Sequence, residues 1–254
     1  MAKIGIITGA SAGLGQEYVR QVIRLHPEIE ELWLIARRRE RLEALAAAHP
    51  ERRFRILPLD LSEQASFESL EAALQEAGPD VGLLINNSGF GKLGYFEEIP
   101  RKEETGMVDV NVRAMVAVTH SVLPFMQEGA MILNVCSIAA YLPNPRMAVY
   151  SSTKAFVFSF SKALREELKR RRIRVMAVCP GPMETEFFDR AGMGKGTSAL
   201  FDGIPRVNVE EMAAKSLQRA AKGRAVYTNK LLFRLYRVVS KILPHNWLMK
   251  RFTA

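Results

Sequence analysis

The sequence has few cysteines and no apolar run long enough to cross a membrane. Only Cys136 and Cys179 occur among 254 residues, so a disulfide framework is excluded. Each cysteine ends an apolar run, MILNVC or VMAVC, and we expect two buried, reduced thiols, as in cytosolic proteins. No segment approaches the ~20 apolar residues that span a bilayer, and the chain starts with a predicted strand rather than a signal peptide. We therefore expect a cytoplasmic protein.

Acidic residues are absent from the last part of the chain. Residues 228–254 contain six lysines and arginines and no aspartate or glutamate. This segment carries +6 of the formal net charge of +9, which leaves +3 for everything before it. Because the excess is local, the sequence argues against a nucleic-acid-binding surface over the body of the protein.

Apolar runs of strand length alternate with longer segments of helical period. The runs lack polar alternation, which is typical of strands buried on both faces. They are KIGIIT, ELWLIA, FRILPL, GLLIN, MILNVC and IRVMAVC. Helices are predicted between them, for example over residues 13–25 and 39–48. This succession predicts one α/β domain over residues 1–228, a doubly wound parallel sheet with helices on both faces, followed by a helical extension over residues 229–254.

A glycine-rich turn, TGASAGLG, follows the first predicted strand and precedes a helix. Gly9, Gly13 and Gly15 permit a tight turn, a close approach of the backbone to a phosphate, and close packing of helix on strand. The free N–H groups at the start of the helix favour an anion. A plain strand-to-helix turn also uses glycines, but the position after the N-terminal strand favours a dinucleotide site.

The end of the second predicted strand indicates which dinucleotide binds there. A site that prefers NAD usually has an acidic residue at this point, whereas the sequence reads IARRRERL. The guanidinium groups of Arg37 and Arg38 suit the 2′-phosphate of NADP by charge and by geometry. The alternative is a solvated basic start to a helix, which the helix dipole disfavours. We therefore expect NADP(H) as the cofactor.

Tyr150 and Lys154 in VYSSTKAFVF are four residues apart and share one face of a predicted helix. A phenol with a pKa of about 10 is a poor proton donor or acceptor at neutral pH. We expect the neighbouring ammonium, together with the positive ring of an oxidised nicotinamide, to lower the pKa of Tyr150 toward about 7. Ser137 follows the fifth predicted strand, at the edge where parallel sheets bind ligands, and its hydroxyl can hold a substrate oxygen beside the phenol.

These motifs together resemble the short-chain dehydrogenase/reductase family to about residue 224. INNSG is similar to the family motif NNAG, DVNVRA contains its asparagine, and CPGPMET resembles its PGxxxT segment. The resemblance implies a Rossmann-type fold, with Asn111, Ser137, Tyr150 and Lys154 as catalytic residues and Asn111 holding a water that leads to the lysine. It implies no metal ligands. It implies cofactor contacts from Gly9, Ser11, Ala12, Gly13, Leu14, Gly15, Arg37, Arg38, Asp60, Leu61, Asn87, Ser88, Gly89, Tyr150, Lys154, Pro180, Gly181, Met183 and Thr185.

The sequence departs from the family pattern in two places. Ser88 stands where the family usually has alanine, which adds a hydroxyl near the cofactor. Ala12 stands where relatives that prefer NADP often have a basic residue. Arg37 and Arg38 must then recognise the 2′-phosphate, with help from the Ser11 hydroxyl.

The tail segment KLLFRLYRVVSKIL has the period of an amphipathic helix. Its apolar stripe contains Leu231, Leu235, Val238 and Ile242. Two alternatives stay open for this stripe. It packs on the protein itself, on a subunit partner or over the substrate cleft, or it makes a peripheral contact with an anionic membrane. Nucleic acid is not expected as a partner.

The substrate is expected to be a small carbonyl compound or alcohol. A lipophilic one is favoured if the tail borders the cleft or touches lipid. The loop after the sixth predicted strand would then offer an apolar face to the substrate, and the alternative is that the same residues close a core. The residues of that face are Phe187, Phe188, Met193, Leu200 and Phe201. The resemblance also implies a homo-oligomer, a dimer or a tetramer, through helices near residues 102–126 and 149–172.

Two functions compete for this sequence. The first is an NADP(H)-dependent oxidoreductase that reduces a carbonyl group or oxidises the alcohol. The second is a catalytically silent NADP-binding regulator or a membrane-associated scaffold. Silent relatives usually lack one catalytic group, and the set of Asn111, Ser137, Tyr150 and Lys154 is complete here, so the sequence favours the enzyme.

Overall fold

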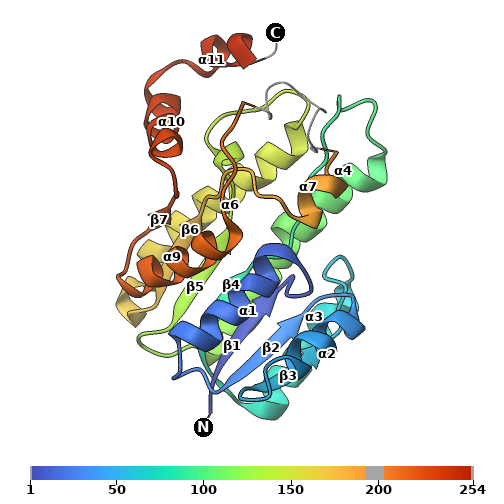
Figure 1. Cartoon of the computed structure of the whole chain (residues 1–254), viewed down its shortest axis with the longest axis vertical. Coiled ribbons are helices and arrows are strands. Elements are labelled where there is room, and N and C mark those ends of the chain that lie inside the picture. The colour runs from blue at the N-terminus through green and yellow to red at the C-terminus, as the bar shows by residue number, and fades with distance from the viewer. Residues whose placement is uncertain (1, 193–202, 253–254) are drawn as a thin grey trace.

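A parallel sheet forms the centre of the protein (Figure 1). The computed structural model describes residues 2–192 and 203–252. The seven strands lie in the order β3-β2-β1-β4-β5-β6-β7, and every neighbouring pair is parallel. They are β1 (Lys3–Thr8), β2 (Glu31–Ile35), β3 (Arg53–Leu57), β4 (Asp80–Asn86), β5 (Met131–Val135), β6 (Arg174–Val178) and β7 (Val226–Tyr227).

Helices cover both faces of the sheet. One layer contains α1, α2 and α9, and the other contains α3, α5 and α6. The α-helices are α1 (Gly13–Leu25), α2 (Arg39–Ala47), α3 (Gln64–Ala77), α4 (Arg101–Val108), α5 (Ala114–Val122), α6 (Ala148–Glu167), α7 (Glu186–Arg190), α9 (Val209–Ala221), α10 (Leu231–Ile242) and α11 (His245–Phe252). The doubly wound parallel α/β fold predicted from the sequence is confirmed.

The strands are apolar on both sides because two separate cores lie against the sheet. Along β4, Leu83 and Ile85 point into the core beneath α1 and α9, while Leu84 points into the core beneath α3, α5 and α6. All three side chains are fully buried. Successive residues of a strand face opposite ways, so a strand between two helical layers needs apolar residues at every position.

Two elements differ from the sequence-based prediction. Strand β7 was not predicted, because its two residues are too short to produce a pattern and it pairs only at the sheet edge, with β6. The helical pattern near residues 102–126 is divided by a π-helix, Asp109–Arg113, between α4 and α5. A π-turn inserts an extra residue into a helix and often occurs at functional sites.

The tail forms two helices that extend away from the body of the protein (Figure 1). The first, α10, was predicted from the sequence as a helix near residues 230–243, and it covers Leu231–Ile242. In the part of the chain that the structure describes, no helix has both the length and the apolarity needed to cross a membrane.

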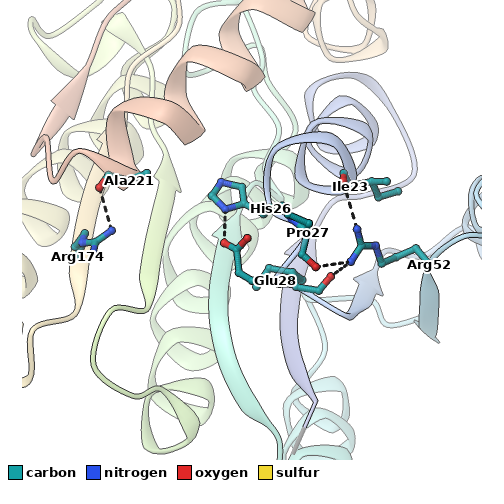
Figure 2. A network of polar contacts seen from close by, with 8 residues as sticks. Ile23, His26, Pro27, Glu28, Arg52, Arg174 and Ala221 are labelled. Atoms are coloured by element: carbon teal, nitrogen blue, oxygen red, sulfur yellow. Dashed lines mark hydrogen bonds and ion pairs between the residues drawn. The ribbon is translucent and has the colours of Figure 1, made fainter.

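Arginine side chains brace the edge of the sheet where the strands begin (Figure 2). Arg52 donates hydrogen bonds to the carbonyls of Ile23 and Pro27, each at 3.3 Å, near the end of α1. Arg174 donates to the carbonyl of Ala221, the last residue of α9, at 3.0 Å. A cation at the C-terminus of a helix satisfies unpaired carbonyls and complements the helix dipole. These contacts hold α1 and α9 at the edge opposite the strand carboxyl ends.

A chain of buried amide and hydroxyl groups crosses the core between β4, β5 and α6. The Asn86 amide donates to the Oδ1 atom of Asn134 at 2.8 Å and to the Thr119 hydroxyl at 2.9 Å. The Asn134 amide donates in turn to the Ser161 hydroxyl at 2.9 Å. Asn134 is completely buried, so each of its neighbours depends on it for a hydrogen bond.

Replacing Asn134 by alanine should therefore destabilise the protein. The change leaves the Asn86 donor without its acceptor and removes the donor to Ser161, and we expect a loss of about 1–3 kcal/mol in the free energy of unfolding. Urea unfolding followed by circular dichroism measures it. Gln127→Ala, at an exposed position, is the control and should change stability little. Equal unfolding midpoints for the two variants would show that the amide chain does not support the fold.

Candidate active site

A cavity of about 1200 Å³ lies at the carboxyl ends of the strands. In an open parallel sheet this edge is where ligands bind. The sequence-predicted site residues line this cavity with two exceptions, Gly15 and Asn111. Gly15 packs behind the glycine turn, and Asn111 is fully buried. The structure thus brings together residues from segments spread over the first three quarters of the chain.

The glycine turn between β1 and α1 needs its glycines for two different reasons. Gly9 and Gly13 have φ angles of +68° and +53°, which side-chain-bearing residues rarely adopt. A Cβ atom on Gly15 would lie 2.1 Å from the carbonyl oxygen of Gly9, so any side chain there would force the turn apart. The turn leaves the start of α1 open toward the cavity, where its N–H groups suit a phosphate.

Thr8 and Asn87 tie the glycine turn to the end of β4. The Thr8 hydroxyl accepts hydrogen bonds from the backbone N–H groups of Asn87 and Ser88, both at 2.9 Å. The Asn87 side chain donates to the carbonyls of Thr8 at 3.1 Å and Gly9 at 3.3 Å. The preceding residue, Asn86, is turned into the core instead. The NNSG motif therefore has one structural asparagine and one that shapes the cavity.

Tyr150 and Lys154 lie one turn apart on α6, and both face the cavity. The Lys154 ammonium is 5.8 Å from the centre of the Tyr150 ring and donates a hydrogen bond to the carbonyl of Val135 at 3.0 Å. Ser137 precedes a short 3₁₀-helix, Ile138–Ala140, and its hydroxyl accepts a hydrogen bond from Ala139 N–H at 3.1 Å. Three of the four predicted catalytic side chains, those of Ser137, Tyr150 and Lys154, thus meet on one wall of the cavity.

In the protein without a nicotinamide, the pKa of Tyr150 is not lowered. Burial raises the pKa of Tyr150 above its ordinary value, and hydrogen bonding with Ser137 offsets only part of this effect. Burial also lowers the pKa of Lys154. The sequence shows that the phenol and the ammonium are neighbours, but it does not show that the amine is directed at a strand carbonyl and that both groups are shielded from water.

Asn111 lies within the π-helix and binds the backbone of the loop after β4. Its amide N–H₂ donates to the carbonyl of Phe90 at 2.9 Å and to the Thr153 hydroxyl at 3.0 Å, and its oxygen accepts from Phe90 N–H at 2.9 Å. Both donors are therefore used, and one acceptor lone pair is left. A Cβ atom on Gly89 would lie 2.8 Å from the Asn111 oxygen and 3.5 Å from the Lys154 ammonium, so Asn111 sits directly behind the cavity wall.

Arginine side chains and the carboxylate of Glu186 lie at the end of the cavity near Ser11. This carboxylate was not predicted from the sequence as part of the site. Arg38 contacts the Ser11 hydroxyl at 3.2 Å and forms an ion pair with Glu186 at 2.8 Å. Arg41 pairs with the same carboxylate at 2.5 Å. These two arginines lower the pKa of Glu186 to about 2. Glu186 could not be found from the sequence, because 145 residues separate it from Arg41.

Asp60 lies beside the second predicted arginine. Its carboxylate is 3.7 Å from Arg37 and accepts hydrogen bonds from the Ser62 backbone at 3.0 Å and the Ser62 hydroxyl at 2.7 Å. Burial acts to raise the pKa of Asp60, but the bonds from Ser62 and the charge of Arg37 lower it overall. Asp60 is therefore ionised at neutral pH and has its position fixed.

These residues fit a dinucleotide. The glycine turn provides a cradle whose shape depends on the lack of a side chain at position 15, since a Cβ there would collide with the Gly9 carbonyl. Ser11, Arg37 and Arg38 line the cavity at the end of β2, where a ribose phosphate is expected, and Asn87 and Gly89 line the part closer to Tyr150. The Thr185 side chain lies against the turn, 3.2 Å from where a Cβ on Gly13 would be. The cradle and the cations suit the phosphates of such a ligand.

The part of the cavity beyond Tyr150 is mainly apolar. Phe187 packs on Tyr150 with ring centres 5.9 Å apart. The first turns of α10 also reach the cavity, and Phe233 packs against Gly181 so closely that a Cβ there would lie 2.3 Å from its ring. The sequence pointed to Phe187 and Phe188, whereas it gave no sign that Phe233 lines the site. The other residues of the predicted loop face, Met193, Leu200 and Phe201, lie outside the described residues.

Cys136 and Cys179 directly follow the neighbouring strands β5 and β6. Both thiols are free and buried, as the sequence predicts. The Cys136 thiol donates to the backbone carbonyl of Lys154 at 3.1 Å. This contact attaches α6 to the end of β5, next to Ser137. The thiol therefore helps to position the wall of the cavity that carries Tyr150 and Lys154.

Comparison with known proteins identifies close relatives of this chain. It is 31% identical over 234 residues to serine 3-dehydrogenase from Agrobacterium fabrum, covering 89% of this chain and 91% of the relative. It is 36% identical over 232 residues to sulfoacetaldehyde reductase from Chromohalobacter salexigens, covering 89% and 90%. Both names describe oxidoreductases that act on an alcohol or a carbonyl group.

Solved structures of dehydrogenases and reductases also match this chain. A short-chain dehydrogenase from Sphingobium yanoikuyae in complex with NADPH matches with a TM-score of 0.80 and 28% identity, covering 98% of this chain and 95% of that chain. A 3-ketoacyl-(acyl-carrier-protein) reductase from Brucella melitensis complexed with NADH matches with a TM-score of 0.76 and 27% identity, covering 89% and 96%. The model of the short chain dehydrogenase family matches residues 3–195, and the chain belongs to this family of oxidoreductases.

Proposed function

We propose that the protein is an NADP(H)-dependent carbonyl reductase that also catalyses the reverse oxidation of the alcohol. The observation that carries this proposal is the meeting of Ser137, Tyr150 and Lys154 on one wall of a single cavity. Arginines that suit a 2′-phosphate line the same cavity. The nicotinamide-dependent relatives support a dinucleotide, although one matched structure holds NADPH and another NADH.

Tyr150 is proposed to donate the proton in the reductive direction. When bound, the cofactor supplies a hydride to the carbonyl carbon. The carbonyl oxygen takes its proton from the Tyr150 hydroxyl, which yields the alcohol and leaves a phenolate that is reprotonated from solvent. The Ser137 hydroxyl binds the same oxygen and aligns it with the phenol. A well-placed acid of this kind contributes about 10²–10⁴-fold to the rate.

Lys154 is proposed to stabilise the phenolate while it exists. Its ammonium is close to the Tyr150 ring, and a positive charge at that distance in a shielded site favours an anion. The Val135 carbonyl keeps the ammonium on the cavity side of α6. Asn111 is proposed to hold the water of a proton relay, through its remaining lone pair or its main chain, because both of its amide donors are already used.

NADP(H) is proposed over NAD(H) because of Arg37 and Arg38. In the structure the Glu186 carboxylate forms an ion pair with the Arg38 guanidinium. A 2′-phosphate would compete with this carboxylate for the same donors, since both are anions suited to the guanidinium fork. Glu186 is therefore proposed to weaken NADP binding, while Arg38 strengthens it.

The substrate is proposed to be lipophilic, because aromatic side chains line the cavity beyond Tyr150. Residues 1–228 are proposed as the catalytic domain and residues 229–254 as an extension to it. We also propose a homo-oligomer through α5 and α6, where Val116 and Phe156 are exposed at 38% and 39%.

Tyr150→Phe should lower turnover by about 100- to 10,000-fold, because the proton donor to the carbonyl oxygen is lost. NADPH binding should persist. A panel of aldehydes, ketones and hydroxyacyl compounds, followed by NADPH absorbance, measures turnover, and NADPH fluorescence measures binding. The matched control is Tyr18→Phe, whose buried hydroxyl binds Ser216 at 2.8 Å away from the cavity, and it should keep its activity. Near-normal turnover of Tyr150→Phe would contradict Tyr150 as the proton donor, whereas no turnover of the unmodified protein with any compound would favour the silent regulator.

Arg38→Ser and Glu186→Gln should change cofactor preference in opposite directions. Arg38→Ser loses a charge-assisted bond to the 2′-phosphate and should lower the ratio of kcat/KM for NADPH over NADH by about tenfold or more. Glu186→Gln removes the competing carboxylate and should raise this ratio. Arg39→Gln is the control, since Arg39 pairs with Glu43 on the surface of α2 and does not line the cavity. Equal ratios for all variants would contradict recognition of the phosphate by Arg38.

A further inference from the structure

The helix α10 contacts the protein through a narrow seam. Phe233 and Ser240 are its buried residues, and Tyr236 packs on Tyr141 with ring centres 6.0 Å apart. Arg234 adds a hydrogen bond to the carbonyl of Thr228 at 2.9 Å. The spacing of the buried positions places them on one face of the helix. This face contains a serine and is not the most apolar one.

The most apolar face of α10 points away from the protein. Leu231, Leu235, Val238 and Ile242 are exposed at 69%, 55%, 49% and 73%. Leu232, Val239 and Leu243 widen the stripe and are also exposed. The sequence left open whether this stripe packs on the protein itself, and the structure shows that it does not. A contiguous apolar patch of this kind normally marks an interaction surface.

Positive charge lies along one side of this apolar face. Arg234 and Lys241 are exposed on α10 and lie beside the stripe by helical spacing. The whole tail from residue 228 to residue 254 contains no acidic residue. Trp247, on α11, is 49% exposed and is of the kind that favours the boundary between water and lipid. The combination of an apolar face, flanking cations and an aromatic residue is typical of helices that lie on membranes.

We propose that the exposed face of α10 docks on an anionic lipid membrane. The apolar residues would enter the boundary between headgroups and acyl chains, and the cations would contact lipid phosphates. A second copy of this chain fits the surface less well. In a two-fold interface the same patch meets itself, so an acid-free tail would face an identical set of cations.

Docking in this way would bring the cavity close to lipid. Phe233 and Tyr236, in the first two turns of α10, line the cavity, while the opposite face of the same helix carries Leu235, Val238 and Ile242. Leu232 lies between these two faces and borders both the cavity and the stripe. Figure 1 shows α10 and α11 projecting from the body of the protein, so the sheet does not obstruct their outer side. A membrane-bound α10 would then hold the apolar end of the cavity within reach of compounds dissolved in the bilayer.

The proposal is tested with vesicles of phosphatidylcholine, with and without phosphatidylglycerol. The full chain should sediment with the anionic vesicles, and less so at high salt because salt screens the cations. The combined variant Leu235→Ser, Val238→Ser and Ile242→Ser should bind these vesicles about a hundredfold more weakly, because three apolar side chains no longer enter the lipid. None of these residues lines the cavity, so NADPH binding and turnover with a water-soluble carbonyl compound should be unchanged.

The matched control keeps the same positions apolar, with Leu235→Ile, Val238→Leu and Ile242→Leu. It should bind anionic vesicles as the unmodified chain does. Failure of the unmodified chain to bind vesicles would overturn the proposal, and so would equal binding by the serine variant. A serine variant that instead loses an oligomeric state in light scattering, with no vesicle binding by any form, would show that a second copy covers the face. Each of these results is independent of whether the protein is an oxidoreductase.

Discussion

A buried ammonium fixes the geometry on which the site depends. The Lys154 amine is almost fully excluded from water, and a charge in such a position needs a partner. It finds one in the carbonyl at the end of β5, while the Cys136 thiol binds the backbone of the same lysine. Two contacts, one from the last residue of β5 and one from the residue after it, thus hold α6 in place. Because Tyr150 lies one turn earlier on α6, these contacts also position its side chain.

The sequence predicted the fold well because the sheet is buried on both faces. Six apolar runs, such as MILNVC, are long enough and uniform enough to be recognised as strands. The same reasoning could not find β7, whose two residues pair only with β6 at the edge. Nor could it find the π-turn around Asn111, because a single extra residue changes helical spacing too little to be seen in one sequence.

The sequence motifs predicted many of the residues that line the site, but they did not predict all of the contacts between those residues. The glycine turn, Arg38, Ser137 and Tyr150 occupy one cavity as the motifs indicated. The sequence did not reveal contacts between residues that are far apart in the chain, and it did not reveal the effect of burial on side chains. Glu186 meets Arg38 across 148 residues. The pKa of Tyr150 is raised because burial outweighs its hydrogen bond to Ser137, and burial is a property of the folded chain that residue spacing does not reveal.

Figure 2 shows the carbonyl groups bound by Arg52 and Arg174. These groups lie where the strands begin, at the edge of the sheet opposite the cavity. Their hold on α1 and α9 involves no side chain that lines the cavity. Mutations that reshape the apolar end of the cavity therefore leave this bracing intact. In evolutionary terms the framework and the pocket can diverge separately, and a duplicated gene for such a chain can acquire a new substrate without first accumulating compensating changes in its sheet.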